Sequence, residues 1–354
     1  MTSALGSVGS RRLRLGVLGC ANIARQFVRD VQDSAFVQVV AVASRDTAKA
    51  AAFAREWHVP RHHARYEDLL TDDTVDAVYV PLPNSLHAPW CLKAMAAGKH
   101  VLCEKPLTLG RREAEQLFAA ARLHGVMLLE AYPYWFQPQT RDLLALLEGG
   151  AESVLGEVRS VQASFGFTLA RPQGNIRMDP QLGGGALLDA GSYPLSLIRL
   201  VMGCAPREVV AHARAATSGV DIATTATLLY GDGRTAQMSC AMDAATHRQA
   251  TVVGSRGVVH TEYLNHTHAG DHPHPWGYLP SQMRVRRGTL NSVPFEPVHS
   301  ATGSGFAFAA EAFARVVAAQ DRAAIERAAQ ASIDIAATLE AVALSARTGR
   351  LVKL

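Results

Sequence analysis

The chain has 354 residues, 48% of them hydrophobic and 19% charged, which is typical of globular proteins and long enough for two domains. Its 35 basic and 31 acidic residues leave a net charge of +4, too small for a nucleic-acid-binding protein but suited to an anionic small molecule. No apolar run is long enough to span a membrane, and residues 1–12 lack the apolar core of a signal peptide. The five scattered cysteines favour a reducing cytoplasm over a disulfide framework or a zinc site.

A turn of small residues near the N-terminus is the first motif. The apolar segment 13–18 predicts a buried parallel strand, and a helix is expected over 22–31. Between them, Gly19, Ala21 and Ala24 take the places of the glycines in the G-x-G-x-x-G fingerprint, where small side chains let a diphosphate approach the helix N-terminus. A plain strand-to-helix turn is the alternative. The cofactor-binding residues predicted here are Gly19, Cys20, Ala21, Asn22 and Ile23.

The end of the second predicted strand, 37–43, indicates which nicotinamide cofactor is used. NAD-binding units place an acidic residue here to hold the ribose 2′-hydroxyl. This chain has Ser44 and Arg45 instead, and a hydroxyl with a guanidinium suits a 2′-phosphate. Together with Lys49 they predict NADP(H) rather than NAD(H), and a solvated turn is the alternative.

Strands and helices continue to alternate as in a doubly wound parallel sheet. Strands are predicted over 77–80, 99–103 and 126–130, separated by helices that end near residues 97 and 124. Because the carboxyl ends of parallel strands share one sheet edge, the segments that follow two of them are expected beside the nicotinamide. For His87 a structural role is the alternative. The predicted residues are Pro81, Leu82, Asn84, His87, Glu104 and Lys105.

The second half of the chain reads as a different kind of unit. Helices are predicted to about residue 147 and over 186–202, 305–319 and 328–346, the last two packing back on the sheets. Apolar and polar residues alternate in several further segments, as in strands with one face packed on helices. These predicted strands are 158–167, 208–215, 222–229, 236–242, 250–254 and 258–263.

A candidate proton donor lies in the predicted helix 186–202. Asp189 and Tyr193 are four residues apart and therefore share one helical face. A ketone that accepts a hydride develops negative charge on oxygen and needs a proton. A tyrosine, whose ordinary pKa is about 10, can supply it when a nearby cation stabilises the phenolate, and Lys105 is that candidate cation. The alternative is that Tyr193 is an amphipathic core residue.

Four segments taken together resemble the Gfo/Idh/MocA family of NAD(P)-dependent oxidoreductases, from about residue 13 to the C-terminus: G-V-L-G-C-A-N-I-A, P-L-P-N-x-x-H, E-K-P-L and G-G-G-A-L-L-D-A-G-S-Y. The resemblance implies an α/β fold, with an N-terminal Rossmann domain followed by an α+β domain on an open, largely antiparallel sheet. We therefore expect a disordered leader at 1–12 and domains at 13–131 and 132–354. The exposed sheet face implies a homo-oligomer, a dimer or tetramer, and the Lys105–Pro106 bond is commonly cis in the family.

The resemblance also narrows the substrate. Many relatives have histidine where this chain has Tyr193, whereas the glucose-fructose oxidoreductase, dihydrodiol dehydrogenase and sugar 3-ketoreductase branches have tyrosine. Segments 171–177 and 183–193 are similar to those of C-3 ketoreductases of antibiotic deoxysugar pathways. This implies NADPH-dependent reduction of a dTDP-3,4-diketo-2,6-dideoxyhexose at C3. An NADP-dependent aldose (xylose-type) or trans-dihydrodiol dehydrogenase is the alternative, and a non-catalytic redox regulator is a third, against which Lys105 and Tyr193 argue.

Four further residues are expected to face the substrate. The resemblance places Asp189 in the sugar site, although it is also placed to cap the helix start. Arg171 and Arg177 bind a substrate diphosphate or only solvate their loop. At Gln137 many relatives have histidine, so this residue forms a hydrogen bond without titrating, or has no role.

A tract of histidines looks metal-rich at first sight. Its glycine, proline and asparagine content gives no regular scaffold, and zinc would duplicate what Lys105 and Tyr193 supply. We therefore predict a surface loop and no metal site. The residues are His260, His266, His268, His272 and His274.

Overall fold

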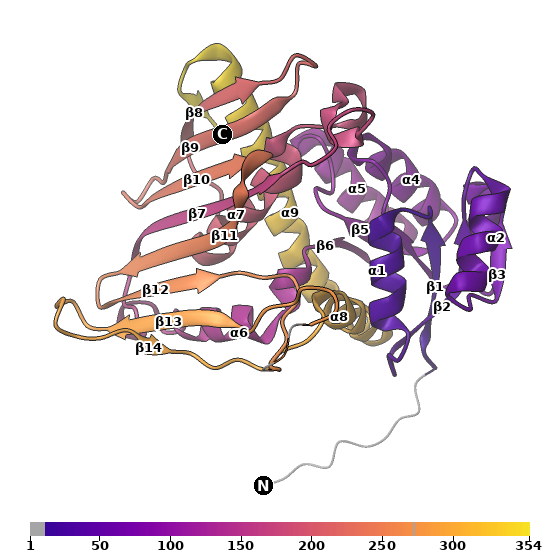
Figure 1. The fold of residues 1–354 in the computed structure, drawn as a ribbon, viewed down its shortest axis with the longest axis horizontal. Helices are drawn as coiled ribbons and strands as arrows, with labels where there is room; N and C mark the ends of the chain where they lie inside the picture. The colour runs from indigo at the N-terminus through magenta and orange to yellow at the C-terminus, as the bar shows by residue number, and fades with distance from the viewer. Residues whose placement is uncertain (1–10, 271, 273) are drawn as a thin grey trace, which may run out of the picture.

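The computed structural model describes residues 11–270, 272 and 274–354, in which two β-sheets are joined by a layer of helices (Figure 1). The predicted leader lies outside the described residues except for 11 and 12. None of the described helices is long and apolar enough to cross a membrane.

The first sheet has six parallel strands in the order β3-β2-β1-β4-β5-β6, so the strand order reverses between β1 and β4. The predicted Rossmann arrangement is confirmed, and the short strand β3 is an addition. The strands are β1 (Leu13–Leu18), β2 (Val37–Ala43), β3 (Arg61–His63), β4 (Ala77–Val80), β5 (His100–Glu104) and β6 (Leu128–Ala131). The helices between them are α1 (Asn22–Val31), α2 (Thr47–Glu56), α3 (Tyr66–Leu70), α4 (Asn84–Ala96) and α5 (Arg111–His124).

Both faces of the first sheet are buried at its centre, where the strands are apolar, whereas the short edge strand β3 is polar and partly exposed. In β4 the side chains alternate between two cores: Tyr79 packs on the side of α1 and α8, and Val78 on the side of α4 and α5. Tyr79 stacks on Phe27 of α1 with ring centroids 3.9 Å apart. The sheet is therefore fixed from both sides, and its carboxyl edge is left for a ligand.

The second sheet has nine strands in the order β14-β13-β12-β11-β7-β10-β9-β8-β15. Its pairs are antiparallel except β7 with β10, which agrees with the predicted fold class. The longer strands are β7 (Val158–Thr168), β8 (Glu208–Ala215), β9 (Asp221–Leu229), β10 (Thr235–Ala241), β11 (Asp243–Gly254) and β12 (Gly257–Glu262). Three strands at or next to the sheet edges were not predicted because they are short or polar: β13 (Gln282–Arg287), β14 (Glu296–Pro297) and β15 (Val352–Lys353).

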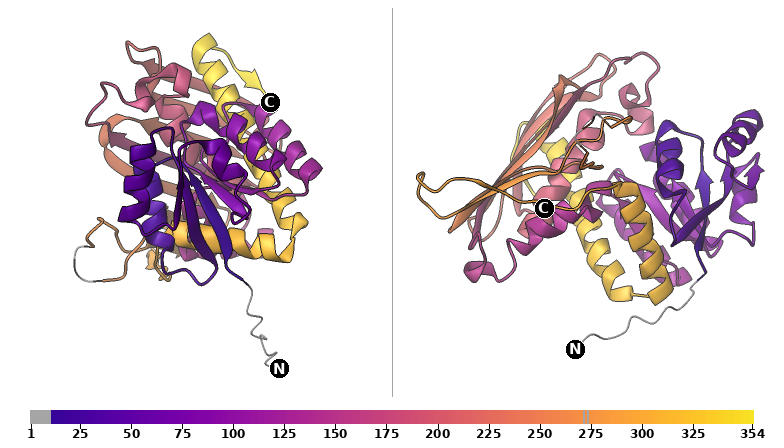
Figure 2. Two further views of the ribbon diagram at one scale, coloured as in Figure 1. Left: turned by 90° about the vertical axis from the view of Figure 1, so that its right-hand side faces the viewer. Right: turned by 60° about the horizontal axis from the view of Figure 1, so that its bottom comes forward.

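Only one face of the second sheet carries helices. The right-hand view of Figure 2 shows this sheet nearly edge-on, with the helical layer on one side. That layer is formed by α6 (Pro138–Ala145), α7 (Ser192–Met202) and α9 (Arg322–Thr348). The open face is a shallow concavity of about 1260 Å³ whose lining includes Gln162 and Thr251. The remaining turns are the 3-10 helices Pro133–Phe136, Gly150–Glu152, Ile176–Met178 and Pro180–Leu182 and the π-helical turn Leu187–Gly191.

The last two helices return to the first sheet. From α8 (Gly305–Ala319), Phe306 and Phe313 enter the core of α1 and β4. Helix α9 begins at Arg322 rather than at the predicted residue 328, because the Asp321 side chain caps it by accepting from the Ala324 backbone N–H (2.9 Å). The C-terminal helices thus pack against the N-terminal domain.

Replacing Phe313 by Ala is expected to destabilise the protein by about 3–5 kcal/mol, because the fully buried ring leaves a cavity between α8 and the first sheet. Leu123→Ala, at a side chain that is 81% exposed, is the control and should change stability by less than about 0.5 kcal/mol. Urea unfolding measures both. A loss below about 1 kcal/mol for Phe313→Ala would contradict the packing described here.

Candidate active site

The turn after β1 has the geometry that a diphosphate requires. Gly19 has φ of +112°, and a Cβ there would meet Leu82 Cδ2 at 3.2 Å, so only glycine is accommodated. Helix α1 begins at Asn22, and no side chain caps its free N–H groups. Gly19, Cys20, Ala21, Asn22 and Ile23 therefore form a cradle for an anion at the helix N-terminus.

The end of β2 presents the residues predicted to bind a 2′-phosphate. Ser44 is 8% exposed, and its hydroxyl accepts from the backbone N–H of Asp46 (3.2 Å). Arg45 is exposed, and none of the ion pairs in the described part of the chain involves it. The Lys49 ammonium lies 3.6 Å from the Asp46 carboxylate, which offsets its charge. Arg45 is thus the strongest candidate for a phosphate contact.

The loops after β4 and β5 lie together, as predicted. Pro81 and Leu82 lead from β4 into the α4 helix, whose first residue, Asn84, donates to the Gly183 carbonyl of the second half of the chain (2.8 Å). His87 is wholly buried, with Nδ1 2.8 Å from the Pro106 carbonyl and Nε2 2.8 Å from the Leu82 carbonyl. The predicted contact of His87 with the cofactor is therefore corrected: its two ring nitrogens hold the loops after β4 and β5 together.

The E-K-P segment is held by two buried carboxyl groups. Glu104 accepts a hydrogen bond from the Tyr79 hydroxyl (2.6 Å), and burial raises the pKa of Glu104. The Lys105–Pro106 peptide bond is cis, as the resemblance implied. Glu130 accepts from the Leu107 backbone N–H (2.8 Å), and its burial raises the pKa of this carboxyl to about 7.

A partly buried ion-pair cluster joins the two halves of the molecule. Lys105 Nζ donates to the Asp189 carbonyl (2.9 Å) and to its Oδ1 (3.0 Å), while Arg177 Nε donates to Oδ2 (2.5 Å). Burial alone would raise the pKa of Asp189, but Lys105 and Arg177 outweigh it and lower this pKa to about 2. Burial likewise opposes the charge of Lys105, yet Asp189 raises the pKa of this ammonium above its ordinary value. Lys105 and Asp189 therefore both stay charged at neutral pH.

The backbone of Asp189 is not the α-helix that the sequence predicts. Residues Leu187–Gly191 form a π-helical turn that leads into α7, and a Cβ on Gly191 would meet Cys240 Sγ at 2.9 Å. Asp221 receives the Leu187 backbone N–H (2.8 Å), so Asp189 is not needed as a cap. Its carboxylate is left to Lys105 and Arg177.

Tyr193 lies beside this cluster and is 6% exposed. Lys105 Nζ is 4.7 Å from the centroid of its ring, so the predicted lysine lies over the ring rather than bonded to the hydroxyl. A second cation, Arg248 of β11, is closer, with its Cζ 3.9 Å from the same centroid. The Tyr193 hydroxyl accepts a hydrogen bond from Asn265 Nδ2 (3.1 Å).

Two predicted substrate residues lie apart from this cluster. Gln137 is 1% exposed, and its amide Nε2 donates to the carbonyl groups of Asn265 (2.7 Å) and Gly303 (2.8 Å). The predicted contact of Gln137 with the substrate is thus corrected to a structural role, which was neither of the two expected alternatives. Arg171 is exposed on its loop, and its side chain makes none of the ion pairs or hydrogen bonds among the described residues.

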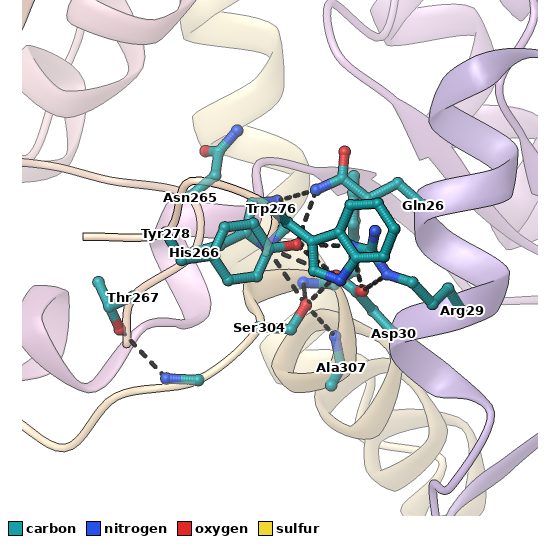
Figure 3. A network of polar contacts seen from close by, with 12 residues as sticks. Gln26, Arg29, Asp30, Asn265, His266, Thr267, Trp276, Tyr278, Ser304 and Ala307 are labelled. Carbon is teal, nitrogen blue, oxygen red and sulfur yellow. Dashed lines mark hydrogen bonds and ion pairs between the residues drawn. The ribbon is translucent and has the colours of Figure 1, made fainter. Parts of the chain in front are cut away.

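The histidine tract is not simply a surface loop. His266 has a side chain only 10% exposed, because its ring packs between Tyr278, stacked at 4.8 Å, and Phe306 of α8. Burial lowers the pKa of His266 to about 4. Figure 3 shows the cluster around His266, in which side chains of α1 contact side chains from the last third of the chain. We call this cluster the clasp. The clasp consists of Gln26, Arg29, Asp30, His266, Tyr278 and Ser304. Among the described residues no three His, Cys, Asp or Glu side chains are placed to hold a metal ion.

Sequence reasoning missed Arg248 and Asn265. Arg248 lies at the same strand parity as the buried Ala250 and Val252, and a charged residue in line with a core face is the signal that was available. Asn265 follows β12 in an irregular segment, where no periodicity marks it.

A Rossmann sheet with an anion cradle at its carboxyl edge, next to a lysine and a tyrosine, defines a nicotinamide-dependent oxidoreductase. Residues 13–132 match the family model described as "Oxidoreductase family, NAD-binding Rossmann fold", and residues 144–260 match "GFO/IDH/MocA C-terminal domain". The chain belongs to the Gfo/Idh/MocA family, and the prediction that it is an oxidoreductase is confirmed.

Three similar proteins illustrate the range of this family. D-xylose 1-dehydrogenase (NADP(+)) 2 of Haloferax volcanii is 34% identical over 97% of this chain and 100% of its own length. The dTDP-3,4-didehydro-2,6-dideoxy-alpha-D-glucose 3-reductase of Actinomadura kijaniata is 41% identical over 69% of this chain and 73% of its own. The crystal structure of KijD10, a 3-ketoreductase from Actinomadura kijaniata with NADP and TDP-benzene, has a TM-score of 0.82 and 33% identity, covering 95% and 98% of the two chains. The predicted cofactor, NADP(H), is confirmed by these relatives.

Replacing Glu130 by Gln is expected to stabilise the protein at high pH. Since burial raises the folded pKa of Glu130 to about 7, the folded state binds this proton more tightly than the unfolded state, and stability is lost as the pH rises through about 7. Glutamine keeps an oxygen for the Leu107 N–H and does not ionise. Between pH 5 and pH 8 the variant should gain about 2–3 kcal/mol relative to wild type.

Urea unfolding at the two pH values measures this difference. Glu152→Gln, at a side chain that is 90% exposed, is the control and should show no pH-dependent gain. An equal effect of Glu130→Gln at pH 5 and pH 8 would show that Glu130 is ionised in the folded protein at both.

Proposed function

We propose that this chain is an NADPH-dependent sugar ketoreductase that transfers a hydride to C3 of a dTDP-3,4-diketo-2,6-dideoxyhexose in deoxysugar biosynthesis for antibiotic glycosides. The observation that carries the proposal is the convergence of Lys105, Asp189, Arg177 and Tyr193 at the carboxyl edge of the Rossmann sheet. The similarity to ketoreductases of this chemistry supports the substrate.

Each side chain of the cluster has a role in this reaction. When bound, NADPH supplies a hydride to the carbonyl carbon of the substrate. Tyr193 donates the phenolic proton to the carbonyl oxygen, on which negative charge develops. Lys105 stabilises that charge and the resulting phenolate, and Asp189 keeps Lys105 protonated. Asp189 also accepts from a substrate hydroxyl, and Arg177 binds the substrate diphosphate.

The residues that would hold the cofactor lie at the carboxyl ends of four strands, β1, β2, β4 and β5. Gly19, Cys20, Ala21, Asn22 and Ile23 receive the diphosphate, and Ser44, Arg45 and Lys49 receive the 2′-phosphate. Pro81, Leu82, Asn84, Glu104 and Lys105 line the nicotinamide end. The absence of a side-chain cap on α1 and the unpaired Arg45 in the described part of the chain support this arrangement.

An NADP-dependent aldose dehydrogenase of the xylose type, or a trans-dihydrodiol dehydrogenase, is the second candidate. The observation in its favour is that the xylose dehydrogenase of Haloferax volcanii aligns with 97% of this chain, whereas the ketoreductase of Actinomadura kijaniata aligns with 69% of it. A non-catalytic redox regulator is disfavoured, since a sensor needs neither Lys105 nor Tyr193.

We further propose a homo-oligomer in which a second copy covers the open face of the second sheet. The exposed Val210 and the concavity along this face support an interface there. The division into domains at 13–131 and 132–354 is part of the same proposal, because the first sheet ends at Ala131. The five cysteines are all unpaired, which supports a cytoplasmic location.

NADPH is expected to bind at least about tenfold more tightly than NADH, because only NADPH carries the phosphate that pairs with Arg45. Arg45→Ala should remove most of this preference by weakening NADPH binding alone. Fluorescence titration of both cofactors measures it, with Arg55→Ala, exposed at the end of α2, as the control. Equal dissociation constants of the wild type for NADPH and NADH would refute this assignment.

The substrate is tested by two assays: NADPH with a dTDP-3,4-diketohexose, and NADP+ with D-xylose or a trans-dihydrodiol. We expect turnover in the first. Turnover only in the second would establish the alternative. In either assay Tyr193→Phe should lower turnover at least about a hundredfold while NADPH affinity is kept. Near-normal turnover of this variant would exclude Tyr193 as the proton donor.

A further inference from the structure

The Tyr193 hydroxyl is held by a single side chain, Asn265, which lies after β12. Asn265 Nδ2 is 3.1 Å from the phenolic oxygen, and Arg248 Nη2 donates to Asn265 Oδ1 (3.1 Å). A guanidinium has only donors, so the arginine fixes which end of the amide faces the tyrosine: it is the N–H end. The phenolic oxygen therefore accepts from Asn265. In the part of the chain that the structure describes, no other hydrogen bond uses the Tyr193 hydroxyl, and its own proton stays available.

The backbone of Asn265 is fixed from several sides. Its carbonyl accepts from Gln137 Nε2 (2.7 Å) and from the Gly305 backbone N–H (3.0 Å). The next residue, His266, belongs to the clasp, where its Nε2 lies 3.1 Å from Gln26 Nε2 of α1 (Figure 3). The helix that starts at the cofactor turn thus holds the segment that carries Asn265.

Arg248 adds a charge to this arrangement. Its guanidinium packs over Tyr193 and, at 4.7 Å, over Phe165 of the neighbouring strand β7. None of the carboxylates in the described ranges pairs with it, and its Nε is buried without a hydrogen-bond partner. An unneutralised cation so close to the ring stabilises the negative charge that the proposed proton transfer leaves on the phenolic oxygen.

We propose that Asn265 is a positioning residue for the proton donor and that Arg248 orients it. The inference rests on the proposed function of Tyr193. In the reduction, the Tyr193 O–H bond breaks, the proton moves to the substrate oxygen, and the electron pair stays on the phenolic oxygen. The Asn265 N–H already points at the phenolic oxygen and stabilises the electron pair that stays there. It also directs the Tyr193 O–H away from Asn265 and toward the substrate. The hydride comes from NADPH to the substrate carbon.

The titration of a tyrosine depends on the titratable groups around it. The test therefore compares single-residue variants in which the other groups around Tyr193 are unchanged. The groups that face Tyr193 from the elements packed against it are Lys105, Arg248, Tyr79, Tyr132, Tyr134 and Tyr263.

The first measurement needs no substrate: ultraviolet difference spectra of the protein minus its Tyr193→Phe form, followed against pH, report the Tyr193 phenolate. Asn265→Ala should raise the titration midpoint by about one pH unit, since a hydrogen bond to the charged form is lost. Arg248→Met should raise the titration midpoint further. Arg248→Lys should keep the positive charge but leave the amide of Asn265 unoriented. Asn291→Ala is the matched control, because Asn291 makes the same contact with Arg286 (3.4 Å) on the exposed side of the protein.

The second measurement is kinetic, in whichever of the two assays above shows turnover. Asn265→Ala should lower kcat at least about tenfold while KM and NADPH affinity change less than about twofold, because the amide acts through Tyr193. Intact circular dichroism and NADPH binding confirm that the variant is folded, and Arg248→Lys provides a milder second variant. An unchanged midpoint with unchanged kcat in Asn265→Ala would overturn the proposal. Full turnover of Tyr193→Phe would instead exclude Tyr193 as the proton donor of the proposed function, and this inference with it.

Discussion

The ion pair between Lys105 and Asp189 is the interaction on which the site depends. Lys105 follows β5 of the first sheet, and Asp189 precedes α7 of the second half of the chain. Two charges removed from water are stable only when they are paired and hydrogen-bonded, and here Lys105 makes two contacts with Asp189 while Arg177 takes the second carboxylate oxygen. The pair therefore fixes the two halves relative to each other and sets where Tyr193 stands.

Around this pair the surrounding structure supplies rigidity rather than chemistry. His87 braces the loops after β4 and β5, and Glu130 holds the backbone at Leu107, so the segment that carries Lys105 is fixed on both sides. On the far side, the clasp ties the segment after β12 to α1. These buried polar groups cost stability unless each is satisfied, and they give the reacting groups one geometry in return.

The chemistry itself is concentrated in few residues and agrees with the family to which the chain belongs. One tyrosine is set against two cations, Lys105 and Arg248, and one amide donor, Asn265. This arrangement fits the proposed proton transfer in both directions, reduction of a ketone or oxidation of an alcohol, because proton transfer is reversible.

The amino-acid sequence alone predicted the alternation of strands and helices in the first domain, the cofactor turn and the approach of Lys105 to the segment that carries Tyr193, because local hydrophobic periodicity and short motifs encode them. It did not predict the ion pair of Lys105 with Asp189. It did not reveal that His87 and Gln137 are structural, that His266 is buried against α1, or that Arg248 and Asn265 meet Tyr193. Those contacts join residues far apart in the chain, such as Gln26 with His266 and Tyr193 with Asn265, and no local pattern records them. The packing of the second sheet and its loops on the first sheet determines which polar groups form structural hydrogen bonds and which remain available for the reaction.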